Sequence, residues 1–216
     1  MDVLVIGGAG GVGRRLTSLL TAAGDEVSGL HRHPEQSEAV EQAGGTSVVF
    51  DLVAGTTGEL AALLEGHDAV VFAAGAHGTG RDQTTLIDGQ GLEKAVDASL
   101  QAGVRRFVLV SVFPEAGRSR ETNDGFEHYM RVKKAADVSL TATDLDWVVV
   151  RPGTLTDTPG TGSVHAGWAV PYGDVSRDDV AAFIAAALHE PRLRRVVVEL
   201  TEGQTPAAQA VAELLG

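Results

Sequence analysis

The chain has 216 residues, of which 44% are hydrophobic, so it is long enough to bury one substantial core. Its 29 acidic and 17 basic residues give a formal net charge of −12, which argues against nucleic acid and anionic membrane surfaces as partners. It contains no cysteine, which excludes disulfides, thiol nucleophiles and zinc-thiolate sites.

Short apolar runs alternate with longer amphipathic stretches along the chain. We expect strands over residues 3–6, 27–30, 47–50, 69–72, 106–110, 147–150 and 195–200. We expect helices over residues 12–23, 34–43, 59–64, 84–101, 126–141, 178–189 and 206–215. The segment 153–173 is rich in Gly, Thr and Pro and is predicted to be a loop region. The alternation predicts an α/β fold with a doubly wound parallel sheet and right-handed crossovers.

We expect one domain over residues 1–216, in which residues 152–175 form a small C-terminal segment on the substrate side. The start, Met1 to Gly7, has no basic region and no long apolar region, and so does not resemble a signal peptide. No run approaches about 18 uninterrupted apolar residues, the length needed to cross a bilayer. We therefore expect a cytoplasmic protein that binds no membrane.

A glycine-rich turn lies between the first predicted strand and the first predicted helix. It fits two overlapping spacings, Gly8-x-Gly10-x-x-Gly13 and Gly7-x-x-Gly10-x-x-Gly13. In either spacing one glycine permits the tight turn, one lets a pyrophosphate approach the backbone, and the last lets helix and strand pack closely. The free N–H groups at the helix start, at Gly11 and Val12, complete an anion-binding site. The turn predicts a Rossmann-like dinucleotide site; a glycine-rich loop without a ligand is the alternative.

The end of the second predicted strand indicates which dinucleotide binds. It reads Leu30-His31-Arg32-His33, and no acid follows until Glu35, where an NAD site usually places a carboxylate for the ribose 2′-hydroxyl. Arg32 instead offers a planar cation suited to a 2′-phosphate, and His33 is placed to assist. We therefore predict NADP(H) over NAD(H). The alternatives are a solvated Arg32, and a metal pair at His31 and His33 for which no third ligand is apparent.

Two further strand ends carry candidate cofactor contacts. Asp51, at the end of the third strand, is suited to accept from an adenine amino group or, equally, to cap a turn. Ala73-Ala74-Gly75 ends the fourth strand, and these small residues would let the cofactor ribose lie close to the backbone.

Candidate catalytic residues follow the fifth predicted strand. Tyr129 and Lys133 are four residues apart and would share one helix face, where the ammonium favours tyrosinate and lowers the proton affinity of the phenol. Tyr129 would then act as acid or base at a carbonyl or alcohol, while Lys133 would also hold the nicotinamide ribose. Ser111, at the carboxyl end of the fifth strand, would bind substrate or orient Tyr129. The alternatives are a solvated helix face and a turn serine.

Taken together, these motifs resemble the short-chain dehydrogenases/reductases, and most closely their atypical NAD(P)H-binding, NmrA-like and biliverdin-reductase-B-like branch. Many members of that branch are described as NAD-dependent epimerases/dehydratases. The resemblance spans nearly the whole chain and rests on Gly7-x-x-Gly10-x-x-Gly13, Asp51-Leu52, Ala73-Ala74-Gly75, Phe107–Ser111, Tyr129-x-x-x-Lys133, Leu145–Gly153 and Val175–Ala181.

The resemblance implies that Leu52 contacts the cofactor and that the loop at Pro152, Gly153 and Thr154 packs near the nicotinamide. Related chains often carry two serines at the end of the fifth strand, whereas this chain has Ser111-Val112. If the second serine orients the substrate, this chain lacks it.

We expect an NADP(H)-dependent oxidoreductase that acts on a small carbonyl, quinone or flavin-like substrate. One alternative is a non-catalytic NADP(H) sensor that signals to a partner. Another is a sugar-nucleotide epimerase or dehydratase, although the chain is short for the large substrate domain of such enzymes.

The substrate itself is not readable from the sequence. His165, Trp168 and Tyr172 either line a pocket or pack within the loop region, and we favour packing. The alanine-rich helix over 178–189 is expected in the core rather than at an interface, and the protein is expected to be a monomer or a homodimer.

Overall fold

The computed structural model describes residues 1–76, 78–114, 116 and 123–216. Its strands are β1 (Asp2–Ile6), β2 (Glu26–His31), β3 (Thr46–Val49), β4 (Ala69–Phe72), β5 (Arg106–Val110), β6 (Asp146–Pro152), β7 (Thr154–Thr156), β8 (Ser163–Gly167), β9 (Asp174–Ser176), β10 (Val196–Glu202) and β11 (Thr205–Pro206). Its helices are α1 (Gly11–Ala22), α2 (Ser37–Gln42), α3 (Thr57–Leu64), α4 (Arg81–Thr84), α5 (Leu92–Ala102), α6 (Asp124–Thr141), α7 (Arg177–Leu188) and α8 (Ala207–Glu213). A 3₁₀ turn, η1 (Pro34–Gln36), precedes α2, and a π-helical segment, η2 (Thr85–Gly91), joins α4 to α5.

Nine strands form the main sheet, in the order β11-β8-β10-β6-β5-β4-β1-β2-β3. All neighbours from β10 to β3 are parallel, whereas β8 pairs antiparallel with both β10 and β11. The predicted α/β class is therefore confirmed, as a mostly parallel Rossmann-like sheet with an antiparallel C-terminal segment. β7 and β9 form a separate small parallel sheet.

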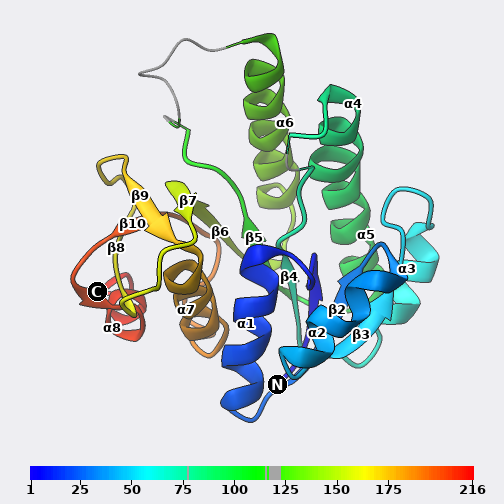
Figure 1. Ribbon diagram of the computed structural model, residues 1–216, viewed down its shortest axis with the longest axis horizontal. Helices are drawn as coiled ribbons and strands as arrows, with labels where there is room; N and C mark the ends of the chain where they lie inside the picture. Colours follow the sequence, from blue (N-terminus) through cyan, green and yellow to red (C-terminus); the bar gives the residue numbers. More distant parts are fainter. Residues whose placement is uncertain (77, 115, 117–122) are drawn as a thin grey trace.

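The two faces of the sheet explain the unbroken apolar run at its centre. In β1, Val3 and Val5 join the core beneath α1 and α7, whereas Leu4 and Ile6 join the core beneath α3 and α5. Side chains alternate between faces along a strand, so a strand covered on both faces must be apolar throughout. Figure 1 shows α1 and α7 side by side on one face of the sheet, and these helices are in contact.

Two predictions of secondary structure are wrong in detail. The single helix expected over 84–101 is instead α4, η2 and α5, because the helical hydrogen-bond pattern widens to the π form between Thr85 and Gly91. The region expected to be a loop contains β7 and β8, and β8 pairs with β10, which lies some thirty residues further along the chain. Short strands that depend on such distant partners carry little local signal.

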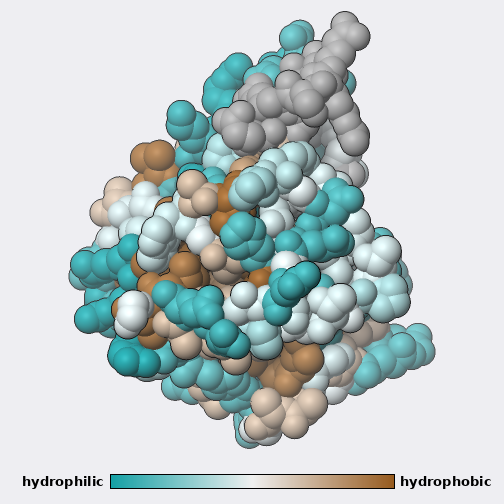
Figure 2. Space-filling view, turned by 90° about the vertical axis from the view of Figure 1, so that its left-hand side faces the viewer, coloured by the Kyte–Doolittle hydropathy of each residue, from teal (hydrophilic) through white to brown (hydrophobic). Residues whose placement is uncertain are grey.

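Figure 2 shows the face formed by the C-terminal segment, on which hydrophobic residues form separate patches among hydrophilic ones. Among the helices that the structure describes, none is both long and apolar enough to cross a bilayer.

Candidate active site

The strand order reverses beside β1, which places a crevice at the carboxyl ends of β1 and β4. From β1 the chain builds β2 and β3 to one side, then crosses to build β4, β5 and β6 on the other. Open α/β sheets bind ligands at such a switch point. Most of the predicted site residues lie there, around two cavities that share Ala73, Ala74, Gly75 and Ala76 at the end of β4.

The glycine turn is packed too tightly against backbone for side chains at three of its positions, Gly7, Gly8 and Gly13, and a Cβ on Gly8 would lie 2.6 Å from Gly29 Cα. Gly7 has φ of +89°, and a Cβ added there would lie 2.7 Å from the Ala74 amide nitrogen. A Cβ on Gly13 would lie 2.3 Å from the Gly7 carbonyl oxygen, which is far inside contact distance. Gly10 differs, since an added Cβ would meet only the Gly7 oxygen, at 3.0 Å. Gly7 and Gly10 line the first cavity whereas Gly8 lines neither cavity, so the structure favours the spacing Gly7-x-x-Gly10-x-x-Gly13.

The start of α1 is suited to hold an anion. Its N-cap, Gly10, supplies no side-chain cap, and no acidic residue lies in the first turn. The unpaired N–H groups and the positive end of the helix dipole therefore face the crevice at Gly11 and Val12, which line the second cavity. The cradle fits the pyrophosphate of a dinucleotide, because small residues surround it and cationic groups lie nearby.

One of these cations is Arg177, the first residue of α7. Its side chain packs over the helix start, so that a Cβ on Gly11 would lie 2.7 Å from Arg177 Cδ. The guanidinium forms an ion pair with Asp157, with Nη1 3.0 Å from Oδ2, and it lines the second cavity. The adjacent Arg15 pairs with Asp178, which links α1 to α7.

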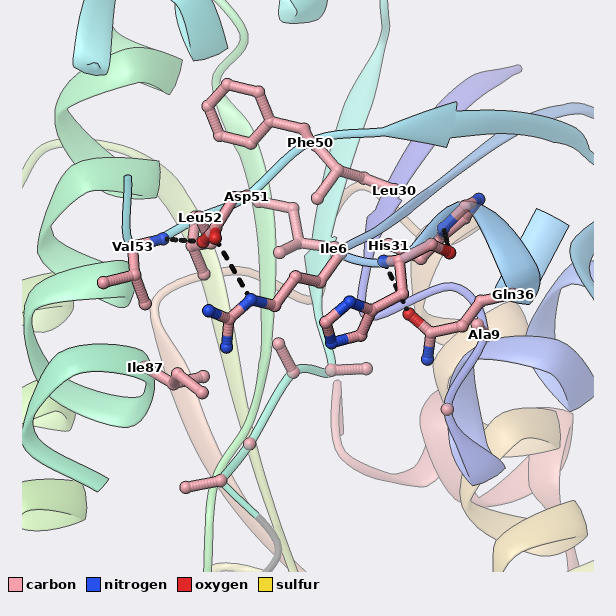
Figure 3. Close-up of a pocket in the computed structure, with 18 of the residues that line it drawn as sticks. Ile6, Ala9, Leu30, His31, Gln36, Phe50, Asp51, Leu52, Val53 and Ile87 are labelled. Atoms are coloured by element: carbon pink, nitrogen blue, oxygen red, sulfur yellow. Dashed lines mark hydrogen bonds and ion pairs between the residues drawn. The ribbon is translucent and has the colours of Figure 1, made fainter. Parts of the chain in front are cut away.

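The first cavity has a volume of about 560 Å³ and lies at the ends of β2 and β3. Arg32 lines it and donates from Nε to Asp51 Oδ2 at 3.1 Å. The other oxygen of Asp51 accepts from the amides of Val53, at 2.8 Å, and Ala54, at 3.3 Å. Figure 3 shows the Asp51 carboxylate facing Val53, with dashed lines for its interactions. Burial opposes ionisation of Asp51, but these amides and the Arg32 charge outweigh it and lower its pKa.

The carboxylate of Asp51 therefore caps a turn and also orients Arg32. Leu52 and His33 line the same cavity, as the sequence predicts for cofactor contacts. The loop after β3 is fixed by Lys94 of α5, whose ammonium donates to the carbonyl oxygens of Leu52, at 2.7 Å, and of Gly55.

The metal alternative for His31 and His33 gains no support. His31 is buried, with Nδ1 3.0 Å from the His33 carbonyl oxygen and Nε2 2.8 Å from the Ser47 hydroxyl. Both ring nitrogens therefore have protein partners. Within residues 1–76, 78–114, 116 and 123–216, no group of three potential ligands is placed to hold a metal ion.

The second cavity, of about 580 Å³, brings together all three candidate catalytic residues, Ser111, Tyr129 and Lys133. Tyr129 is half-buried in its wall. The Lys133 side chain is only 3% exposed, so the solvated helix face considered from the sequence is wrong. Its ammonium donates to the Val110 carbonyl oxygen at 3.1 Å, at the end of β5.

A buried carboxylate that the sequence analysis did not single out faces this lysine. Asp88 Oδ1 lies 3.6 Å from Lys133 Nζ, and the Asp88 side chain is 2% exposed. Burial raises the pKa of Tyr129 well above its ordinary value, and the charges of Asp88 and Asp137 raise it further. The net shift in the pKa of Tyr129 is therefore opposite to the one expected from Lys133 alone, because burial and these two carboxylates dominate it.

Ser111 lines the cavity but its hydroxyl is engaged elsewhere. It donates to Asp137 Oδ1, and the same carboxylate receives the Arg151 guanidinium, with Nη2 2.9 Å from Oδ2. The geometry thus ties Ser111 to Asp137 rather than to Tyr129. Val112 lines a different cavity, together with Arg151 and other residues of α6.

Two residues implied by the family resemblance lie outside both cavities. Pro152 is buried in β6, and the Gly153 amide donates to Leu200 of β10 at 2.9 Å. The next part of this segment, at Leu155, does line the second cavity.

The three side chains of the predicted loop region that were considered for a pocket, His165, Trp168 and Tyr172, pack or lie exposed and line neither cavity. The Tyr172 hydroxyl bonds to Thr154, its ring meets Phe113 edge-on at 5.4 Å, and Trp168 is 57% exposed.

The site thus includes residues that motif reasoning missed, namely Asp88, Arg177, Leu155 and Phe126. Asp88 could have been found from its spacing, because it precedes Leu92, Ala95 and Ser99 on the buried stripe of the predicted helix, where a carboxylate needs a partner.

Comparison with known proteins agrees with this geometry. A family described as NAD(P)H-binding matches residues 7–191. The chain is 39% identical to a Bacillus subtilis protein named as the uncharacterised sugar epimerase YhfK, over 99% of this chain and 100% of that protein. A Bacillus halodurans structure, provisionally described as an NAD-dependent epimerase/dehydratase, superposes with a TM-score of 0.89 at 32% identity, covering 99% of this chain and 100% of that one. The oxidoreductase YlbE of Lactococcus lactis gives a TM-score of 0.87 at 28% identity, covering 100% of this chain and 97% of that one.

Proposed function

Since this chain belongs to the NAD(P)H-binding, atypical branch of the short-chain dehydrogenases/reductases, we propose that it is an NADP(H)-dependent oxidoreductase that reduces a small carbonyl, quinone or flavin-like substrate. The observation that carries this proposal is the second cavity, in which a neutral phenol and a buried ammonium lie beside the strand end and helix start that form the dinucleotide cradle.

The two adjoining cavities are arranged to hold the two halves of a dinucleotide. The adenosine half would lie in the first cavity, the pyrophosphate over Gly10 and Gly11, and the nicotinamide half in the second cavity beside Ala74. The reduced dinucleotide would supply a hydride to the electrophilic carbon of the substrate.

The preference for NADP(H) rests on Arg32. Asp51 orients its guanidinium in the first cavity, and Nε is the atom that this carboxylate engages. The terminal nitrogens of an arginine so held are suited to a phosphate, which accepts two parallel hydrogen bonds.

Tyr129 would complete the reduction of a carbonyl substrate. As the carbonyl carbon gains hydride, its oxygen takes the electron pair of the C=O bond and becomes basic. The Tyr129 O–H bond breaks and the proton passes to that oxygen, which gives an alcohol and a phenolate. The phenolate then regains a proton from water. Its high pKa makes this recovery favourable at neutral pH.

The test is oxidation of NADPH in the presence of a panel of aldehydes, ketones, quinones and flavins. Tyr129→Phe should lower turnover by about 10²-fold or more, the usual contribution of a general acid, and leave the Kd for NADPH unchanged. Tyr172→Phe, in the other tyrosine of the chain, is the matched control and should keep full turnover. Turnover that survives Tyr129→Phe would remove this residue from the mechanism.

The same panel separates two other functions. Tight NADPH binding with no turnover on any acceptor would favour a dinucleotide sensor. Two of the relatives carry epimerase names. In an epimerase of this kind the cofactor takes a hydride from the substrate and later gives it back to the same substrate. That chemistry would convert a sugar nucleotide without net consumption of NADPH, and finding it would replace the reductase proposal.

A further inference from the structure

Asp88 occupies an unusual place in the wall of the second cavity. It lies at the centre of the π-helical segment η2, between α4 and α5. Such segments are rare and are often found at functional sites. Its Oδ2 accepts from the Ala76 amide at 3.0 Å, and a Cβ added to Gly75 would lie 3.2 Å from its Oδ1. The carboxylate is thus fixed against the strand end where the two cavities meet.

The carboxylate and the Lys133 ammonium depend on each other. Both side chains are almost completely buried, at 2% and 3% exposure, and their charged atoms are 3.6 Å apart. A buried charge without a partner is strongly unfavourable, so removal of either member would leave the other in an unfavourable state. The other neighbour of Lys133, the Val110 carbonyl oxygen, orients the ammonium but does not neutralise it.

The Asp88–Lys133 pair determines the electrostatic potential at the Tyr129 hydroxyl. Tyr129 is one helical turn from Lys133, and an uncompensated ammonium there would favour the phenolate. Asp88 cancels that effect, and its charge is among the causes that raise the pKa of Tyr129.

Other charged groups face the same region from neighbouring elements. Arg81 of α4 and Arg177 of α7 line the cavity, and Asp137 of α6 lies near Ser111. His128 of α6 has Nε2 2.8 Å from the Thr85 hydroxyl of η2.

We propose that Asp88 is a positioning residue that holds Lys133 against β5 and keeps Tyr129 protonated, so that the resting site carries the proton that a carbonyl oxygen takes up. This inference rests on the proposed function in making Tyr129 the proton donor. It adds to that function the group that keeps the proton donor protonated.

The ionisation of Tyr129 can be measured directly, because the chain has only two tyrosines. In a Tyr172→Phe background, the ultraviolet absorbance of tyrosinate reports Tyr129 alone as the pH is raised. We expect no ionisation before the folded state is lost. Adding Asp88→Asn should bring ionisation of Tyr129 into the pH range in which the protein is folded. We expect its midpoint at least one pH unit below the pH at which the background unfolds, which is a tenfold or greater loss of proton affinity. Asp97→Asn, on the exposed face of α5, is the matched control and should change nothing.

If Asp88→Asn alone is unstable, a double variant still tests the Asp88–Lys133 pair. Asp88→Asn combined with Lys133→Met removes both buried charges, and should restore folding and again leave Tyr129 un-ionised until the protein unfolds. Absence of ionisation in folded Asp88→Asn overturns the proposal, as does ionisation in the folded range that persists in the double variant. Because this titration requires no substrate, its failure refutes the role of Asp88. Absence of turnover on every acceptor would instead refute the proposed function.

Discussion

The guanidinium of Arg32 is held by the carboxylate of Asp51, with Nε 3.1 Å from Oδ2, at the point where β2 and β3 end side by side. Arg32 is 47% exposed at its side chain, so it remains accessible to a ligand in the first cavity. The pair therefore provides an oriented cation in the first cavity, where the proposed function would place the 2′ group of the dinucleotide.

Replacement of this arginine should separate the two cofactors. Arg32→Ala is expected to raise the Kd for NADP(H) by roughly 10–150-fold, the equivalent of about 1.5–3 kcal/mol for hydrogen bonds to a charged group, and to leave the Kd for NAD(H) almost unchanged. Calorimetric titration with both cofactors measures this. Arg192→Ala, in an exposed arginine paired with Glu190, is the control. An equal loss for both cofactors would contradict the 2′-phosphate assignment.

Two glycines should respond to the same substitution in opposite directions. Gly13→Ala places a methyl group 2.3 Å from the Gly7 carbonyl oxygen and should destabilise the protein by about 1–3 kcal/mol while abolishing dinucleotide binding. Gly58→Ala, in the first turn of α3, meets no atom within 4 Å and should stabilise by up to about 1 kcal/mol through helix propensity. Urea unfolding compares the two variants. Equal stability of Gly13→Ala and the parent would show that the turn relaxes.

The buried Arg106 should be important for stability rather than for activity. Its guanidinium donates to the carbonyl oxygens of Leu193, at 2.7 Å, and Ala187, which joins the start of β5 to the end of α7. Arg106→Met leaves these buried acceptors without donors and should cost on the order of 2 kcal/mol in the free energy of unfolding. Arg105→Met, in the exposed neighbour, is the control for loss of charge. An equal effect of both variants would mean that net charge, not helix capping, is responsible.

The stabilising contribution of Asp178 should depend on pH. The Gly160 amide donates to it at 3.0 Å and lowers its pKa; burial opposes this, and Arg15 lowers the pKa further. A lowered folded-state pKa means that the contribution is complete above the ordinary value of 3.8 and is lost as the pH falls through the folded-state value. The difference in unfolding free energy between the parent and Asp178→Asn should therefore be largest at neutral pH and shrink in acid. A difference that is constant with pH would show that the charge of Asp178 is not involved.

Local patterns in the sequence were sufficient to predict the parallel sheet and its helices. The unbroken run Val3–Ile6 requires cover on both faces, and Gly103, with φ of +75°, ends α5 as a C-terminal glycine should. The antiparallel strand β8 was not predicted, because of its five residues only Val164 is buried and its partner β10 lies far along the chain.

The site was predictable to the extent that its residues follow strand ends or share one helix face. Tyr129 and Lys133 meet in one cavity for that reason. Their electrostatics were not predictable from spacing alone, since the opposing charge comes from Asp88, forty-five positions before Lys133, and from the burial of all three groups.

The contact between α1 and α7 has a consequence for how this protein could acquire new substrates. Leu16 and Leu20 of α1 share one core with Phe183 and Ile184 of α7, so the first and last thirds of the chain are one structural unit. Replacing the whole C-terminal third by that of a relative would therefore expose the apolar face of α1 to solvent. Exchange is possible only within the surface segments of this third, such as the one that carries Leu155, and specificity would have to diverge there by small steps.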